Sequence, residues 1–584
     1  MLRLSISERM RLAALGVDRT RRAAVAQALG SPLLRWRYGS PIAERLLIVP
    51  QDLRTADPSL WHEFKLGQFG LAGTIAHIDD NSPFEIEAPS KGWARALHGF
   101  SWLRHLAAVD SDDARELARG LAVEWTVRHG NGSGVAWEPA VAARRLISWI
   151  SHAHVLLDGG DQASYDALTE SLGRQLVRMS ASWRDAPQGH PRLIALTSLV
   201  LADLCIAGHD RQLTGVERAF SEELSRQILE DGGHISRNPA VLVELMLDFL
   251  PLRQCFAARD RPVPPVLATA TDHMLRMLRK LRLGDGRLAR FNGMGVASPA
   301  ALATVLAYGD AEAPLTTGPG DSRYMRLERD QTIVIADVGS PPPLELSGEA
   351  HAGALSIEVS VGTRLMFVNG GSPGLSGHEW RATSRSTAAH STLVLDEKSS
   401  SRLLRHAGLE VMAGGVPIRG PDHVRAKFAD TAGSVTLDAE HDGYLGRYGL
   451  MHKRQVTLSD DGRRIEGVDR LAPQRGTMRL KRDVPFSVHF HLHPEVQCTA
   501  ASRQSATIVL GDGATWRVAV EGASLSVEES IHFADSSGPR QSQQIVLRGA
   551  TAGETEVRWS VALQARPRDE ALQARLRHDE AATG

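Results

Sequence analysis

The chain has 584 residues, which is too long for one hydrophobic core, so two or more domains are expected. Hydrophobic residues make up 42% and charged residues 23%, which is ordinary for a globular protein and excludes a disordered one. The 67 basic and 68 acidic residues nearly cancel, so no nucleic-acid partner held by broad positive charge is expected. Only three cysteines occur, without a CxxC pair, which argues against a disulfide framework or a thiolate zinc site.

Residues 1–55 are expected to form an N-terminal extension. Charges interrupt its apolar residues throughout, so no secretory signal is predicted there. No apolar run along the chain approaches the roughly 20 residues that span a bilayer. We therefore expect a soluble protein without a membrane span, and the sequence leaves cytoplasm and periplasm open.

Apolar residues repeat with a helical period between about residues 95 and 285. Leu193, Leu196, Val200 and Leu204 share one face, and Gly208 is expected to end that helix. Further helical stripes are predicted at residues 242–249, where Pro251 is expected to end the helix, and at residues 274–281. The first half of the chain is therefore predicted to be all-helical.

After about residue 320 the apolar period changes to two. Residues 331–339, 354–362, 364–371 and 391–398 are expected to be short strands. Asp461-Gly462 and Asp512-Gly513 are expected to be hairpin turns. Many short strands at this spacing predict an antiparallel sandwich, followed by a polar tail at residues 566–584.

Three elements of the second half carry polar residues that are unusual for a plain sandwich. They are Gly348-Glu349-Ala350-His351-Ala352-Gly353-Ala354-Leu355-Ser356, Phe367-Val368-Asn369-Gly370-Gly371 and Arg385-Ser386-Thr387-Ala388-Ala389-His390-Ser391-Thr392. Two histidines and a side-chain oxygen on neighbouring strands suit a zinc ion. The alternative is a pair of hydrogen-bonded histidines without a metal.

Together these elements resemble the heparinase II/III family of bacterial polysaccharide lyases, which typically shows G-H-x-H-A-D-A-L-S, then a strand ending D-S-G, then R-S-x-x-A-H-N-T. Residues 231–253, 439–459 and the region around Trp137, Arg144 and Trp149 extend the similarity to both halves. The resemblance implies an N-terminal α/α toroid, here residues 56–315, followed by a C-terminal antiparallel β-sandwich, here residues 316–565, with substrate bound between them.

The resemblance also implies a metal site. His351 and His390 match two histidine ligands of the family, and Asn369 stands where the family has an aspartate ligand. Because Asn369 lacks the negative charge that helps to hold a dication, one weakly bound zinc ion is expected.

The match to the family's catalytic residues is incomplete. A lyase acting on uronic acids must neutralise the C5 carboxylate, remove the C5 proton and protonate the departing O4. Glu349 occupies the position of the first, often catalytic, histidine of the first motif. The usual N-H-L-L pattern reads His190-Pro191-Arg192-Leu193-Ile194, and the expected tyrosine falls on Asn238-Pro239-Ala240-Val241.

Several polar residues remain as candidates for this chemistry. Their expected roles come from loop position and side-chain type, because a helix start and an arginine fork suit anions, and a carboxylate beside a metal site suits proton abstraction. The catalytic candidates are His234, Glu349 and Tyr444, and the substrate-binding candidates are Arg192, Arg237, Asn238, Asn292, Trp380 and Arg385, with His378 as a further loop candidate. For each, the competing interpretation is capping, turn formation or loop packing.

A second metal signal is the alternation of His489, His491 and His493, which places all three on one strand face. A polar strand face is the simpler interpretation.

The leading hypothesis is a polysaccharide lyase-like enzyme that cleaves an acidic, uronic-acid-containing glycan by β-elimination. Two rivals remain open: a glycan-binding protein that has lost the proton-transfer pair, and a hydrolase on the same scaffold with paired carboxylates. An acidic polysaccharide or oligosaccharide is the expected partner, and a homodimer is a further possibility.

Overall fold

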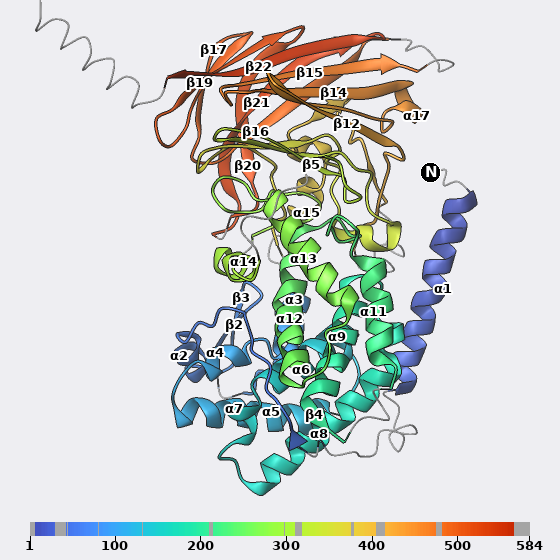
Figure 1. Ribbon diagram of the computed structural model, residues 1–584, viewed down its shortest axis with the longest axis vertical. Coiled ribbons are helices and arrows are strands. Elements are labelled where there is room, and N and C mark those ends of the chain that lie inside the picture. Colours follow the sequence, from blue (N-terminus) through green and yellow to red (C-terminus); the bar gives the residue numbers. More distant parts are fainter. Residues whose placement is uncertain are drawn as a thin grey trace, which may run out of the picture. The chain divides into compact units, whose positions relative to one another are not determined.

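A computed structural model describes residues 6–29, 43, 45–79, 81–130, 132–208, 214–296, 298–309, 318–374, 379–404, 415–474, 482–535 and 537–565. The expected order is confirmed, with helices in the first half of the chain and antiparallel strands in the second (Figure 1). The predicted polar tail and His378 lie outside the described residues. No helix in the described ranges is long and apolar enough to cross a bilayer.

The chain forms two compact units. Unit 1 comprises residues 1–229, 241–275 and 300–310, and unit 2 comprises residues 230–240, 276–299 and 311–584. The predicted domain boundary at residue 315 would assign the segments 230–240 and 276–299 to the helical domain, whereas the contacts of the structure assign them to unit 2. The structure packs both against the strands of unit 2, for example where an added Cβ on Gly284 would lie 1.8 Å from the carbonyl oxygen of Gly362.

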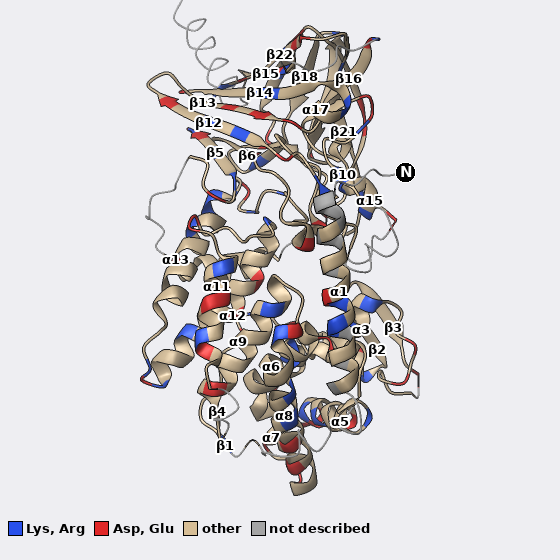
Figure 2. Ribbon diagram, turned by 90° about the vertical axis from the view of Figure 1, so that its right-hand side faces the viewer, with Lys and Arg blue, Asp and Glu red and all other residues tan. Residues whose placement is uncertain are grey.

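Unit 1 is built from helices around an aromatic core that includes Trp93, Trp102 and Trp125. Basic and acidic residues are interspersed on its helices (Figure 2). Its helices are α1 Ile6–Leu29, α2 Leu60–Lys65, α3 Lys91–Gly99, α4 Leu103–Ala107, α5 Asp112–His129, α6 Pro139–Ser151, α7 Ala153–Leu157, α8 Gln162–Ser182, α9 His190–Cys205, α11 Val216–Gln227, α12 Pro239–Ala258, α13 Pro265–Lys280 and α14 Pro299–Leu306. The last three, α12, α13 and α14, have end residues that belong to unit 2. Short strands β1 Arg45–Leu46 and β4 Ile206–Ala207 pair, as do β2 Gln68–Leu71 and β3 Thr74–His77.

Local sequence sets several of these helix ends. The Ser90 side chain accepts a hydrogen bond from Trp93 N at the start of α3, as an N-cap residue does. The predicted end of α9 near Gly208 is close to the observed end at Cys205. The predicted stop at Pro251 is wrong, because α12 continues through it to Ala258. This helix is buried over much of its length, and that packing outweighs the hydrogen bond that proline cannot make.

His105 on α4 contributes a pH dependence to unit 1. Its Nδ1 accepts a hydrogen bond of 2.8 Å from Asp57 N, and burial, followed by the charge of Arg104, lowers the pKa of His105 to about 4. An unfolded histidine titrates near 6.5, so the unfolded chain binds the proton first, and stability is lost as the pH falls from about 6.5 towards 4. In His105→Asn, which keeps an acceptor but does not titrate, urea midpoints measured across this window should fall less steeply than in the wild type. An unchanged slope would show that His105 does not contribute.

Unit 2 is a sandwich of two antiparallel sheets (Figure 1). Their inner faces share one core, in which the ring centroids of Phe490 and Trp559 lie 4.8 Å apart. The first sheet has the order β12 Val424–Thr431, β13 Ser434–His441, β14 Leu450–Ser459, β15 Arg464–Pro473, β22 Thr555–Ala565, β19 Thr515–Glu521, β18 Ser505–Val509 and β17 Gln497–Ser502. The second has the order β20 Ser524–His532, β21 Arg540–Thr551, β16 Val484–Leu492, β8 Arg364–Val368, β7 Ile357–Val361, β6 Thr332–Asp337 and β5 Tyr324–Arg329, with β9 Leu393–Leu395 beside β16.

The predicted strands and turns of unit 2 are confirmed. The four predicted strands are β6, β7, β8 and β9. Both predicted hairpins form, between β14 and β15 and between β18 and β19, where Gly462 and Gly513 have φ of 64° and 85°. The remaining elements are β10 Arg402–Leu403, β11 Ile418–Arg419, the short helices α15 Arg381–Ser384 and α17 Leu445–Tyr448, and short 3-10 helices at Val135–Trp137, Trp183–Asp185, Leu344–Glu349 and Thr387–Ala389.

Candidate functional site

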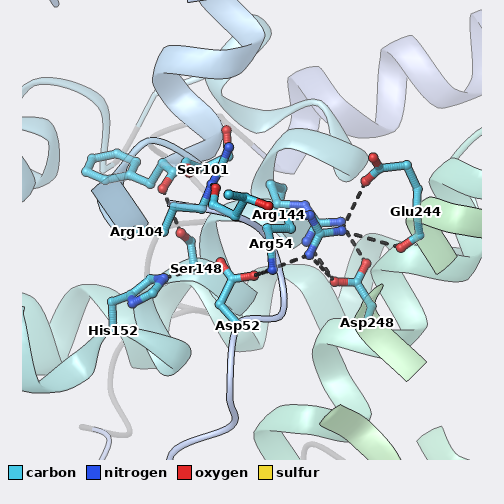
Figure 3. Close-up of polar contacts among 11 residues, drawn as sticks. Asp52, Arg54, Ser101, Arg104, Arg144, Ser148, His152, Glu244 and Asp248 are labelled. Carbon is cyan, nitrogen blue, oxygen red and sulfur yellow. Dashed lines mark hydrogen bonds and ion pairs between the residues drawn. The ribbon is translucent and has the colours of Figure 1, made fainter. Parts of the chain in front are cut away.

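Charged side chains from three separate segments of unit 1 meet at one place, which we call the arginine cluster: Arg54, Arg144, Glu244 and Asp248 (Figure 3). Arg54 comes from the segment between β1 and α2, Arg144 from α6, and the two carboxylates from α12. Glu244 and Asp248 are four residues apart on that helix, so they share one face. Side chains so distant in sequence are brought together only by the folding of the helices.

Asp248 holds the two arginines together. Arg144 donates from Nη1 to Oδ1 at 2.8 Å and from Nη2 to Oδ2 at 2.7 Å, and Arg54 Nη1 donates to Oδ1 at 2.9 Å. Burial by itself would raise the pKa of Asp248, but Arg144 and Arg54 outweigh it and hold that pKa below its ordinary value. Asp248 is therefore ionised at neutral pH.

Glu244 lies at the solvent-exposed side of the arginine cluster. Its side chain is 53% exposed, whereas that of Asp248 is 2% exposed. Arg54 Nη2 lies 3.1 Å from Glu244 Oε2, the only ion pair that the described residues give this carboxylate. The charges of Arg54 and Arg144 lower the pKa of Glu244, because they outweigh the partial loss of water around this carboxylate.

A ring of polar groups surrounds these four residues. Asp52 accepts from Arg54 N at 3.0 Å and lies 3.3 Å from His152 Nε2, and Arg104 donates to Thr55 O at 3.1 Å. His190 opens α9, and burial, followed by Arg144, lowers its pKa. The Nε2 atom of His190 is buried and has no hydrogen-bond partner among the described residues.

Sequence reasoning did not single out Arg54, Glu244 or Asp248. A signal was present in α12, where Glu244 and Asp248 interrupt the otherwise apolar run of residues 240–250 at a helical spacing. Arg192, which was predicted to bind substrate, instead donates to Ala186 O at 2.9 Å and to Arg184 O at 3.3 Å.

The predicted histidine pair forms in unit 2. His351 Nδ1 lies 3.0 Å from His390 Nε2, and His390 Nδ1 lies 2.7 Å from Ser386 O. Burial lowers the pKa of His390 to about 4 and that of His351 well below its ordinary value. Both rings are therefore neutral, and the carbonyl of Ser386 assigns the proton of His390 to Nδ1. His390 Nε2 then accepts from His351 Nδ1.

Asn369 directly follows β8, whereas His351 and His390 lie in the loops that precede β7 and β9. Its Oδ1 accepts from Ser391 N at 3.0 Å, while Nδ2 is buried without a partner among the described residues. His351 Nδ1, His390 Nε2 and Asn369 Oδ1, the atoms that the sequence offers to a metal, each have a hydrogen-bond partner within the protein. The described residues also contain no group of three or more His, Cys, Asp or Glu side chains placed to hold a metal. The weakly bound zinc ion expected from the sequence stays a prediction, and we assign no chemical step to one.

Two predicted substrate-binding residues belong to a buried network in unit 2. Arg237 pairs with Asp337 and donates to Ser340 O at 2.8 Å. Asn292 Nδ2 donates to Tyr324 Oη and to Asp337 Oδ2, both at 2.9 Å. The network ties segments 230–240 and 276–299 to β5 and β6.

Two more of the predicted substrate-binding residues contact the protein itself. Asn238 Oδ1 accepts from Ala240 N at 2.9 Å, which supports the capping interpretation. Arg385 is buried and donates to Ala350 O at 2.8 Å and to Ser347 O at 3.0 Å. It therefore fixes the loop that leads to His351.

The three predicted catalytic residues lie in different environments. His234 is buried beside Ser236, with 2.7 Å between Nδ1 and Oγ. Tyr444 is buried, donates to Leu393 O at 2.9 Å, and has its pKa raised by that burial. Glu349 is 43% exposed and pairs with Arg381. Glu349 is thus the only one of these three residues whose side chain is not buried.

The remaining sequence candidates lie on the sandwich. Trp380 lies 5.8 Å from Phe533 between ring centroids. His489 and His491 lie on the outer face of β16, where His489 contacts Gln544 at 2.9 Å and His491 contacts Ser530 and Ala388 O, both at 2.8 Å. These contacts agree with the polar-face interpretation. His493 follows the end of that strand.

A buried ionic network, not anticipated from the sequence, supports the histidine pair. Arg454 on β14 contacts both oxygens of Asp469 on β15, at 2.8 and 3.0 Å. Its Nη1 also donates to Leu355 O at 2.9 Å and to Ser391 O at 2.8 Å. Arg454 thus joins the first sheet to the residues that follow His351 and His390.

Comparisons with known proteins agree on the fold. Residues 317–560 match the model of the "Heparinase II/III-like, C-terminal" family. The chain is 31% identical over 546 residues to "FtsZ-localized protein C" of Caulobacter vibrioides, covering 91% of this chain and 92% of that protein. The solved heparinase III structure superposes with a TM-score of 0.67 at 12% identity, over 85% of this chain and 81% of that one. A mutant of the heparan sulfate lyase HepC from Pedobacter heparinus gives 0.60 at 16% identity, over 93% and 89%.

Proposed function

Since the chain belongs to the heparinase II/III-like family and has its fold, an α/α toroid followed by an antiparallel β-sandwich, we propose that it binds an acidic, uronic-acid-containing glycan at the arginine cluster. The observation that carries this proposal is the convergence of Arg54 and Arg144 on Asp248, with Glu244 at the open side. An arginine fork matches the planar carboxylate of a uronic acid.

Cleavage by β-elimination is the second candidate function. It requires removal of the C5 proton, rupture of the C4–O4 bond with formation of a C4–C5 double bond, and protonation of O4. The half-exposed carboxylate of Glu349 favours this reaction, because an accessible carboxylate can accept a proton. The burial of His234 and Tyr444 favours the glycan-binding protein that has lost a proton-transfer partner.

A hydrolase on the same scaffold has less support. Hydrolysis of a glycosidic bond uses two carboxyl groups on either side of the bond. In the arginine cluster Asp248 is 2% exposed and held by both arginines, which leaves Glu244 alone. We therefore rank this reaction third.

One experiment separates these functions. The protein is titrated calorimetrically with a panel of acidic polysaccharides, and the same mixtures are followed for the absorbance of unsaturated uronate and for new reducing ends. Binding with the chromophore establishes elimination, reducing ends without it establish hydrolysis, and binding alone establishes the glycan-binding protein. Failure of every polysaccharide to bind would refute the proposal.

We further propose that the protein acts at an FtsZ division assembly. The support is the 31% identity, over 91% of this chain, to a relative whose name places that protein with FtsZ. A fluorescent fusion of the full chain should gather at the division site and disperse when FtsZ is depleted. A fusion that stays uniformly distributed in dividing cells would refute this location.

A further inference from the structure

The two carboxylates of the arginine cluster are held very differently. Asp248 accepts three hydrogen bonds of 2.7 to 2.9 Å from Arg144 and Arg54 inside the unit. Arg54 Nη2 donates to Glu244 Oε2 at 3.1 Å and, at the longer distance of 3.4 Å, to the backbone oxygen of Glu244, whose side chain is 53% exposed. A carboxylate that is half exposed and held by a single arginine is bound weakly, so water or another anion can displace it from Arg54.

We propose that Glu244 holds the place of a ligand carboxylate, and that a uronate carboxylate replaces it on Arg54. This inference rests on the proposed glycan binding and names the group that is recognised. Arg54 is suited to the exchange because Asp248 keeps its Nη1 fixed at 2.9 Å while Nη2 faces the displaceable carboxylate. The guanidinium is thus oriented before the ligand arrives, which reduces the entropic cost of binding.

The charge of the site limits which glycans it accepts. Arg54, Arg104 and Arg144 contribute three positive charges, and Asp52, Glu244 and Asp248 contribute three negative charges, so the site is neutral at rest. Displacing Glu244 frees the charge of one arginine. A glycan with single, well-separated carboxylates matches that charge, whereas clustered sulfates bring negative charge that nothing in the site balances. The expected ligand class is a non-sulfated uronate glycan.

Glu244→Gln tests the exchange. Gln keeps the size of the side chain but no longer competes for Arg54, so a hyaluronan oligosaccharide, which carries carboxylates and no sulfate, should bind about fivefold more tightly to the variant by calorimetry. The matched control is Glu222→Gln, which removes a carboxylate that is 57% exposed and lies 2.9 Å from Arg218 in unit 1, away from the cluster. This control should bind like the wild type. A heparin oligosaccharide of equal length should bind the wild-type protein more weakly than hyaluronan.

The outcomes separate this inference from the proposed function. If the wild type binds hyaluronan and Glu244→Gln binds it equally or less tightly, Glu244 does not hold the ligand's place. A wild-type preference for heparin would overturn the expected ligand class. If the wild type binds neither oligosaccharide nor any other acidic glycan, the proposed function itself fails.

Discussion

Asp469→Asn should lower the free energy of unfolding of unit 2 by about 3–5 kcal/mol, the cost of removing one partner from a buried ion pair. Asp469 is buried and is contacted by Arg454, by His452 Nε2 at 2.7 Å and by Trp559 Nε1 at 2.9 Å. The substitution leaves the Arg454 guanidinium inside the sandwich without its opposite charge. Equilibrium urea unfolding at neutral pH measures the effect.

The direction in which the stability difference between the wild type and Asp469→Asn changes with pH follows from the pKa of Asp469. Burial would raise the pKa of Asp469, but Arg454 and His452 outweigh it and hold the pKa below its ordinary value. The charge therefore stabilises the fold above the unfolded pKa of about 3.9, and that contribution is lost as the pH falls below it. The gap between the wild type and Asp469→Asn should narrow in acid.

The control for Asp469→Asn is Glu556→Gln on the same sandwich. Glu556 lies 2.9 Å from Arg470 on the surface, and such pairs contribute about 0–1 kcal/mol. Equal losses for Glu556→Gln and Asp469→Asn would contradict the account of a buried network.

Asp248→Asn should destabilise unit 1 by a similar amount, about 3–5 kcal/mol, because it removes the charge that two neighbouring arginines share. Arg144 and Arg54, whose side chains are 17% and 13% exposed, would then repel each other without a shared negative charge between them. Tryptophan fluorescence reports the transition, since Trp93, Trp102 and Trp125 are buried in the core of this unit.

A bound uronate glycan should restore part of the lost stability of Asp248→Asn, since a ligand that binds only the folded state stabilises it. The melting temperature of the variant should therefore rise more on adding glycan than that of the wild type. The control is Asp203→Asn, which removes a partly exposed partner of Arg261, 2.6 Å away. If Asp248→Asn lost no more free energy of unfolding than Asp203→Asn, the result would contradict the role of Asp248 as the charge that Arg54 and Arg144 share.

The sequence predicted the fold well because periodicity records which face of an element is buried. The change of period near residue 320 separated helices from strands, and Asp461-Gly462 and Asp512-Gly513 marked two turns that form. The predicted helix end at Pro251 was wrong because the effect of a proline was judged from the local sequence, without the tertiary packing that stabilises α12. The segments 230–240 and 276–299 were assigned by their neighbours along the chain, whereas side-chain contacts place them with unit 2.

The candidate site was less predictable. His351 and His390 were identified from motifs, and the structure places them 3.0 Å apart. Arg237, Asn292 and Arg385 looked available for substrate because the sequence does not show which carbonyls and carboxylates they contact. Arg54 and Asp248 are 194 residues apart, and no local pattern reports a pair at that separation.

A crystal structure of the protein soaked with a hyaluronan oligosaccharide tests the central claim most directly. We expect a uronate carboxylate within hydrogen-bond distance of Arg54 Nη2, with the Glu244 side chain turned away and the Asp248 contacts unchanged. An oligosaccharide bound elsewhere, with Glu244 still 3.1 Å from Arg54, would contradict the account.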